Sequence, residues 1–305
     1  MVHAKPLWIS CNLGLGDAIY ARPFVLSYTD RYRVWVTTAW PELWWDRPDV
    51  MLAPARDGVQ INQDNVDRQP LSTWTMPHQS SIKVMLSYAA DATTHTRPIL
   101  DSLAAQAGVT DFDLSVPLKE EWKQQAADLL DKINPQGLPI CVYRPPTIRK
   151  EWPCISRAPD SAAMDAVVDD AAERYLMVSV AHMRGDQEVL MAQVPKGPQF
   201  LNGEIPWTVL MAVVARAYLV LGSPCMILPM AFSQGTPNFM VYGGYLAPEF
   251  YYHPTLRAPS GFVAPEPFCR CMDEGHDCAK DLDPERAVAA LRRFEADLAS
   301  PDPRA

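Results

Sequence analysis

The stretch 204–244 alternates helix-like and strand-like patterns, and this alternation restricts the fold more than any other part of the chain. The apolar run 218–221 is typical of a buried strand and stops at Gly222. Pro224 is suited to begin the next helix, because its ring pre-sets φ. The Gly-Thr-Pro turn at 235–237 ends that helix before another strand. This order predicts a βαβ unit, whose strand–helix junction is a common phosphate site; an ordinary unit with nothing bound fits equally well.

The same alternation runs through both halves of the 305-residue chain. Strands are expected at 6–10, 33–38, 84–88, 139–143 and 175–180, and helices at 18–28, 97–107, 120–133, 161–174, 187–193 and 283–299. The turn 134–137 marks a boundary, so we expect a first domain over 1–136, a second over 137–282, and a C-terminal helix and tail over 283–305. The pattern predicts an α/β protein with two Rossmann-like parallel-sheet domains facing a central cleft, with ligands at the carboxyl ends of the strands.

Charge and hydropathy argue against two kinds of partner. The net charge is −9 and no Lys/Arg cluster appears, which disfavours tight binding of nucleic acid, although a local groove can still be basic on an acidic protein. No run of about 18 apolar residues predicts a membrane span. The first ten residues lack the apolar core of a signal peptide, so we expect a cytoplasmic protein.

A glycine-rich turn, Asn12-Leu13-Gly14-Leu15-Gly16-Asp17, lies between the first predicted strand and the first predicted helix. It matches the dinucleotide fingerprint G-x-G-x-x-G only in part, because Ile19 stands at the third glycine position. Asp17 has two interpretations. Its charge favours the positive end of the helix dipole, or it is a carboxylate placed to take a proton from an acceptor hydroxyl.

Charged side chains follow the first two strands predicted in the second half. Arg149 and Lys150 are adjacent cations that suit a diphosphate, or that form a solvated pair in a loop. Asp186 and Glu188 suit the hydroxyls of a ribose, or the N-terminus of a surface helix.

Three of the seven cysteines, Cys269, Cys271 and Cys278, lie close to His276 and raise the question of a zinc site. The Cys-x-Cys spacing is tighter than the usual C-x2–4-C of structural zinc sites, and H-x-C is unusual. We therefore expect no metal, and the other cysteines are expected in apolar cores.

Four segments, in order along nearly the whole chain, are similar to one known family. They are Gly14-Leu15-Gly16-Asp17 with Arg22-Pro23, Lys150-Glu151-Trp152-Pro153, the stretch 215–243, and the tail from Cys269-Arg270-Cys271 through Cys278 to Asp283-Pro284-Glu285-Arg286-Ala287-Val288. The chain thereby resembles the heptosyltransferase-like glycosyltransferases of family 9, which have the GT-B fold. The resemblance implies that a sugar moves from a nucleotide-diphosphate sugar, the co-substrate, to an acceptor hydroxyl, with inversion and with no cofactor or obligatory metal.

The resemblance also implies roles for residues of this chain. Asp17 would be the general base, and Lys150 would stabilise the departing diphosphate. The first domain would bind the acceptor and the second the nucleotide-sugar. The predicted donor-binding residues are Arg144, Thr147, Arg149, Asp186, Glu188, Gly222, Ser223, Cys225 and Met226. The predicted acceptor-side residues are Gly14, Gly16, Arg22, Trp44 and Trp45.

Two departures from the family pattern bear on the substrates. Family members carry D-[ST]-G-x-x-H where 224–229 here reads Pro-Cys-Met-Ile-Leu-Pro, which argues against ADP-heptose as donor. The tryptophan-rich stretch 40–45 is atypical and argues against a standard lipopolysaccharide core as acceptor. The acceptor is then another saccharide, or a hydroxymethylated pyrimidine in phage DNA. The alternatives are a catalytically degenerate GT-B protein that binds a nucleotide-sugar or glycan and, third, a dehydrogenase.

Overall fold

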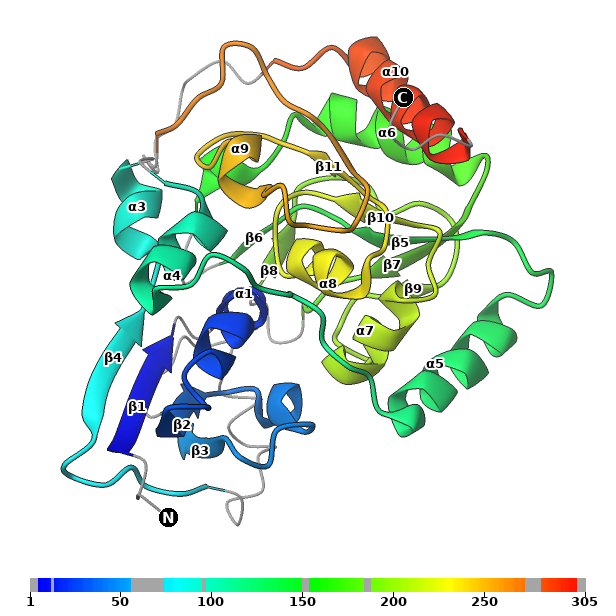
Figure 1. Ribbon diagram of the computed structural model, residues 1–305. Coiled ribbons are helices and arrows are strands. Elements are labelled where there is room, and N and C mark those ends of the chain that lie inside the picture. Colours follow the sequence, from blue (N-terminus) through cyan, green and yellow to red (C-terminus); the bar gives the residue numbers. More distant parts are fainter. Residues whose placement is uncertain are drawn as a thin grey trace. The chain divides into compact units, whose positions relative to one another are not determined.

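A computed structural model describes residues 5–11, 14–55, 74–94, 97–149, 154–183, 188–271 and 281–300 of the chain (Figure 1). The chain divides into two compact units. Unit 1 comprises Met1–Pro117 and Glu249–Leu256, and unit 2 comprises Leu118–Pro248 and Arg257–Ala305. Each unit has its own parallel sheet, so the prediction of two parallel-sheet α/β domains is confirmed.

Unit 1 contains a four-stranded parallel sheet in the order β3-β2-β1-β4. Its strands are β1 (Lys5–Cys11), β2 (Tyr32–Thr38), β3 (Met51–Pro54) and β4 (Ile82–Leu86). Its helices are α1 (Leu15–Leu26), the 3₁₀ turn η1 (Pro41–Trp44), α3 (Ala89–Thr94) and α4 (Ile99–Ala107), and the returning segment contains most of α9 (Pro248–Tyr251). Alternate residues of β1 (Leu7, Ile9 and Cys11) are buried, as expected of a strand with one face toward a core.

Unit 2 contains a six-stranded parallel sheet in the order β12-β11-β10-β5-β7-β9. Its strands are β5 (Ile140–Arg144), β7 (Leu176–Val180), β9 (Gln199–Phe200), β10 (Leu219–Gly222), β11 (Asn238–Val241) and β12 (Ser260–Val263). A separate antiparallel pair joins β6 (Thr147–Arg149) to β8 (Glu188–Leu190). All residues of β5, β10 and β11 are buried, which explains why these strands are mostly apolar in the sequence.

Helices α6 (Ser161–Ala172) and α10 (Pro284–Ala299) pack against each other in unit 2, as the green and red ribbons of Figure 1 show. Ala287 and Leu291 of α10 are part of the buried core of this unit. Asp283 caps α10, since its carboxylate accepts a hydrogen bond of 3.0 Å from the backbone N–H of Glu285. Helix α10 is therefore a component of unit 2.

Helix α5 (Glu120–Ile133) has the predicted bounds but belongs to unit 2, so the units divide at Pro117/Leu118 instead of 136/137. The ring of Trp122 packs against that of Trp207 in α7 (Trp207–Val214), with ring centroids 6.3 Å apart. This contact between distant residues accounts for the place of α5 in unit 2. The only boundary signal in the sequence was the turn that follows the helix.

Two local predictions are wrong. Residues 188–190 form strand β8 instead of a helix, because they pair with β6 and place Glu188 opposite Arg149. Helix α8 (Ile227–Gln234) begins three residues after Pro224, so that residues 223–226 form a loop. The carbonyl of Pro224 accepts a hydrogen bond of 2.8 Å from Arg157.

Candidate functional site

The carboxyl ends of β1 and β4 meet at one edge of the unit 1 sheet, because the two strands are parallel neighbours. Asp17 follows β1 as the third residue of α1, and Tyr88 follows β4. The Tyr88 hydroxyl donates a hydrogen bond to Oδ1 of Asp17. Two residues 71 positions apart therefore meet at this edge.

Burial, the negative charge of Asp17 and the hydrogen bond to it raise the pKa of Tyr88 well above 10. The phenol stays protonated and remains a hydrogen-bond donor to the carboxylate. Burial and the Asp17 charge also raise the pKa of Cys11 to about 12, so this thiol is not a nucleophile at neutral pH.

Gly14 makes room for the carboxylate. A Cβ atom at this position would lie 2.6 Å from Oδ2 of Asp17, closer than a side chain tolerates. Gly14 also precedes the first helical residue, and its carbonyl accepts a hydrogen bond of 2.9 Å from the N–H of Ala18. Gly16 is the second residue of α1, so the structure brings Gly14, Gly16 and Asp17 together as predicted from the motif.

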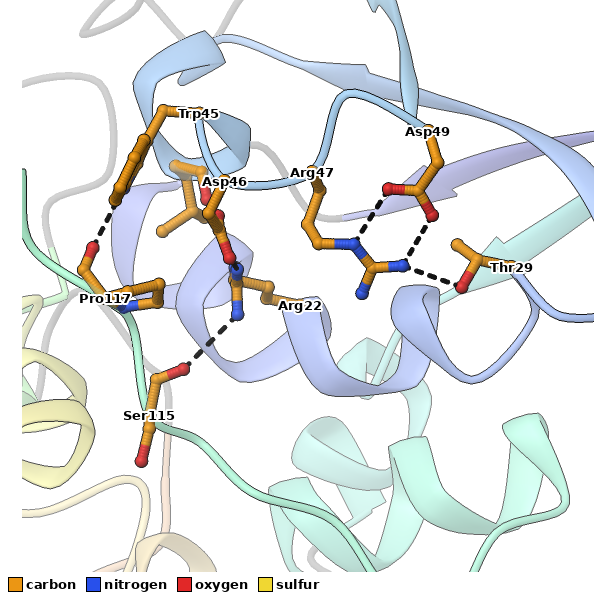
Figure 2. Close-up of polar contacts among 9 residues, drawn as sticks. Arg22, Thr29, Trp45, Asp46, Arg47, Asp49, Ser115 and Pro117 are labelled. Carbon is orange, nitrogen blue, oxygen red and sulfur yellow. Dashed lines mark hydrogen bonds and ion pairs between the residues drawn. The ribbon is translucent and has the colours of Figure 1, made fainter.

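The predicted acceptor-side residues Arg22 and Trp45 are engaged within unit 1 (Figure 2). Arg22 is 4% exposed, and its guanidinium contacts both carboxylate oxygens of Asp46 at 2.5 and 2.7 Å and the carbonyl of Ser115 at 3.3 Å. Trp45 is 39% exposed and donates its indole N–H to the carbonyl of Pro117 at 2.9 Å. Arg22 thus fixes the segment after β2 to α1, and Trp45 retains a partly exposed ring.

Trp44 is buried and lines a small pocket at the carboxyl ends of β1 and β2. The other lining residues are mostly small or apolar: Cys11, Ala18, Ala21, Val36, Thr37, Thr38, Ala39 and Trp40. The indole Nε1 of Trp44 has no hydrogen-bond partner among the described residues. The tryptophan-rich stretch therefore contributes one wall of a pocket beside α1.

In unit 2, the predicted donor residues Arg144 and Glu188 form a buried ion pair. The guanidinium of Arg144 contacts the two carboxylate oxygens of Glu188 at 2.6 and 2.9 Å and the carbonyl of Val180 at 3.3 Å. Burial raises the pKa of Glu188, but the charges of Arg144 and Arg149 outweigh it, so the pKa lies below its ordinary value. Burial lowers the pKa of Arg144, and the Glu188 charge more than reverses this. Both groups are thus charged and already paired.

Arg149 is the more accessible cation at this end of β5. Its side chain is 35% exposed, and its Nε lies 3.3 Å from Glu188 across the β6–β8 pair. Thr147 at the start of β6 is half-buried and stands opposite Leu190. Lys150 and Asp186, predicted to act on the donor, lie outside the described residues.

The loop between β10 and α8 contains the remaining predicted donor residues. Gly222 ends β10, Ser223 is 9% exposed, and Cys225 and Met226 are half-buried just before the first turn of α8. The first N–H groups of a helix lack intrahelical partners and carry partial positive charge, which favours a phosphate. The structure therefore brings these four residues together at the carboxyl end of the sheet.

Arg157 is a cation at this loop that sequence reasoning missed. It ends the 3₁₀ turn η4 (Ile155–Arg157), is half-buried, and donates to the carbonyl of Pro224. Its only local signal was a basic residue four positions after the Lys-Glu-Trp-Pro motif, and its partner is 67 residues away. Its place beside Ser223–Met226 became visible only in the folded chain.

The cysteine cluster is described in part. The Sγ atoms of Cys269 and Cys271 lie 3.1 Å apart, and His276 and Cys278 lie outside the described residues. Among the residues that the structure describes, no group of three or more His, Cys, Asp or Glu side chains is arranged to hold a metal ion. Within the same ranges, no helix combines the length and apolar character needed to cross a membrane.

Comparison with known proteins found similarity at the level of structure. No protein-family model and no curated protein matches the sequence. The glycosyl transferase family 9 protein from Veillonella parvula DSM 2008 is similar with a TM-score of 0.61 and 16% identity, over 97% of this chain and 99% of that one. E. coli ADP-heptose lps heptosyltransferase II is similar with a TM-score of 0.59 and 14% identity, over 97% and 100%.

The bacterial iron-containing dodecameric glycosyltransferase TibC from enterotoxigenic E. coli H10407 is a third similar structure. It has a TM-score of 0.62 and 12% identity, over 97% of this chain and 78% of that one. At such identities the similarity establishes the fold. The chain therefore has the GT-B fold of these glycosyltransferases, as its motifs predicted.

Proposed function

We propose that the protein is a glycosyltransferase that moves a sugar from a nucleotide-diphosphate sugar to an acceptor hydroxyl. The observation that carries the proposal is the carboxylate of Asp17 in the first turn of α1, held by Tyr88 and accommodated by Gly14. The shared fold supports the same reaction class, and one similar structure is TibC in complex with ADP-D-beta-D-heptose.

Asp17 acts in this proposal as the general base. Its carboxylate takes the proton of the acceptor hydroxyl while the hydroxyl oxygen attacks the anomeric carbon. The bond from that carbon to the diphosphate breaks in the same step, so the configuration inverts. Tyr88 fixes the carboxylate and, as a protonated phenol, does not compete for the proton.

Unit 2 supplies the donor-binding groups. Arg157 beside the β10–α8 loop, the partly exposed Arg149 and the N-terminal end of α8 provide positive charge for the departing diphosphate, together with Lys150. Such groups fulfil the role of a divalent ion, so we propose a metal-independent reaction. The ion pair of Arg144 and Glu188 holds the β6–β8 pair in place. In this proposal the two residues position that pair and do not touch the donor themselves.

In this proposal the nucleotide-sugar donor is not ADP-heptose, because residues 224–229 lack the aspartate and histidine of the family motif. The acceptor is a saccharide or a hydroxymethylated pyrimidine in DNA. The partly exposed ring of Trp45 suits stacking on either a sugar or an extruded base, and the net charge of −9 favours the saccharide. A gel shift with modified and plain duplex at two salt concentrations separates the two acceptors.

A thermal-shift panel with UDP, GDP, ADP, CMP and their sugars, in EDTA, tests the donor site. We expect one nucleoside diphosphate to raise the melting temperature, and Arg157→Gln to weaken that shift about 10-fold in apparent affinity, the loss expected for one charge-assisted hydrogen bond. Arg216→Gln, which changes a surface cation of the same unit, serves as the control. No shift with any nucleotide would refute a donor site, and a shift without turnover of the donor would favour the degenerate binding protein.

A further inference from the structure

The side chains of Cys269 and Cys271 face each other at the end of the loop that follows β12. Their Sγ atoms are 3.1 Å apart, and both residues are half-buried. A disulfide needs an S–S distance of about 2.05 Å, so the two atoms have only about 1 Å to travel. We propose that Cys269 and Cys271 form a redox-active dithiol site that exchanges with small-molecule disulfides.

The surrounding backbone holds Cys269 in place. Its carbonyl accepts a hydrogen bond of 2.9 Å from the N–H of Tyr245, in the turn that follows β11. A Cβ atom on Gly244 would lie 2.9 Å from that same carbonyl, so the absence of a side chain there permits the close approach. The sulfur pair thus stands on a fixed support at the carboxyl end of β11.

The sulfur of Cys269 accepts a hydrogen bond from the backbone, since the N–H of Cys271 donates to its Sγ at 3.5 Å. A donor aimed at sulfur favours its negative charge, and the thiolate is the form that attacks a disulfide. Cys269 is therefore the attacking residue, and Cys271 is the residue that completes the ring.

The exchange has two steps. The Cys269 thiolate attacks one sulfur of oxidised glutathione, a new S–S bond forms, and one glutathione thiolate leaves. Cys271 then loses its proton to solvent, attacks Sγ of Cys269 and expels the second glutathione thiolate. The two cysteines lose two electrons in total, and the glutathione disulfide gains them to become two thiols.

The other described cysteines do not offer this chemistry. Cys11, Cys141 and Cys154 are buried, and burial raises the pKa of Cys11 and Cys141. Cys225 is half-buried like the pair, but among the described contacts no sulfur lies against it. The ring closed by Cys269 and Cys271 is very short, so it gains little from chain entropy and is readily reduced again.

The test equilibrates the full-length protein with glutathione buffers of increasing oxidised fraction, in EDTA, followed by acid quench, alkylation and peptide mass spectrometry. We expect the peptide with Cys269 and Cys271 to lose two hydrogen atoms and to resist alkylation. At a fixed concentration of oxidised glutathione, the ratio of oxidised to reduced protein should fall with the square of the reduced glutathione concentration, as an internal disulfide requires. Cys225 in the same sample provides the comparison, with at most a glutathione adduct.

Two variants separate the roles of the sulfurs. Cys271→Ser should accumulate glutathione on Cys269, whereas Cys269→Ser should react at least 10-fold more slowly at Cys271. Complete alkylation of both cysteines at every ratio would overturn the proposal. A disulfide from either residue to Cys278 would overturn it as well, because it would show that the contact between Cys269 and Cys271 is not the reactive one. Neither result depends on whether the protein transfers a sugar.

Discussion

At the residue scale, the pairing of Asp17 with Tyr88 fixes a carboxylate in the first turn of a helix. The phenol holds one carboxylate oxygen, and Gly14 leaves space for the other. A charged group at the start of a helix is often only a capping residue. Here Tyr88, which follows a second strand, contributes a hydrogen bond to it, which a capping role does not need.

Asp17→Asn should lower the rate of sugar transfer by about 10²–10⁴-fold, the usual contribution of a general base. The amide oxygen still accepts the Tyr88 hydrogen bond, so the fold and the nucleotide-induced thermal shift should be unchanged. Initial rates with the donor found in the nucleotide panel provide the measurement. Wild-type activity in this variant would remove Asp17 from the mechanism.

Tyr88→Phe should lower the rate of sugar transfer, because the variant loses the hydrogen bond to the Asp17 carboxylate and keeps the ring that packs on Phe250. The nucleotide-induced thermal shift should be unchanged, since Tyr88 lies in unit 1. Initial rates and thermal shifts of both proteins check this. A wild-type rate in the variant would mean that the hydrogen bond from Tyr88 does not position the base.

At the scale of elements, helix α5 depends on one large aromatic contact. Trp122→Ala should lower the free energy of unfolding by about 3–5 kcal/mol, because it removes the buried ring that packs on Trp207 of α7. Lys123→Ala is the matched control, since the neighbouring side chain is exposed and pairs with Glu120 on the surface. Urea unfolding of the three proteins gives the comparison, and equal effects would contradict the packing of α5 in unit 2.

Helix α10 is attached to α6 by a charge cluster around Asp170. The carboxylate contacts Arg174 at 2.6 Å and Arg292 at 2.5 Å. Burial raises the pKa of Asp170, but hydrogen bonds from the two arginines outweigh it, and the pKa lies below 3.8. A lowered pKa stabilises the fold above the ordinary value of 3.8, and this contribution is lost as the pH falls through the folded-state pKa.

Asp170→Asn should therefore lower the free energy of unfolding at neutral pH by about 1–3 kcal/mol, the range for hydrogen bonds to charged groups. The difference from wild type should shrink as the pH falls below 3.8. Urea unfolding at several pH values checks both statements. A difference that grows toward acidic pH would contradict the assigned direction of the shift.

Most elements were predictable from the sequence, and the exceptions have physical reasons. Helix α5 and strands such as β5 were predictable because their apolar residues repeat with the right period or form an unbroken run. Strand β8 was predicted as a helix, because its pairing with β6 depends on a partner 39 residues away in Arg149. The sequence pattern around β8 does not include Arg149, so it cannot indicate this pairing.

The candidate site was predictable to the same extent. Gly14 and Asp17 belong to a local motif, and so does the loop after Gly222, so both were identified from the sequence. Tyr88 and Arg157 were missed, because each becomes relevant only through a contact with a distant segment. Arg144 and Glu188 were both predicted to bind the donor, and their contact with each other, 44 residues apart, was not predicted.

At the scale of the whole molecule, the two units have separate cores, and the proposal assigns the donor to unit 2. Six of the nine tryptophans lie in unit 1, so intrinsic fluorescence reports mainly on that unit: Trp8, Trp35, Trp40, Trp44, Trp45 and Trp74. A nucleotide at 100 times its Kd stabilises the unit that binds it by about 2.7 kcal/mol. We expect the nucleotide to shift the urea transition followed by far-UV circular dichroism more than the transition followed by fluorescence. Equal shifts in both signals would contradict a donor site confined to unit 2.

The return of residues 249–256 to unit 1 has a consequence for how the protein is made. Within that segment Phe250 packs on Tyr88, and His253 lies against Phe112 and 3.2 Å from Asp101. A ribosome delivers the chain from its N-terminus at about 5–20 residues per second. The full set of these contacts cannot form until 253 of the 305 residues have been joined. Unit 1 therefore stays incomplete while most of unit 2 is being synthesised.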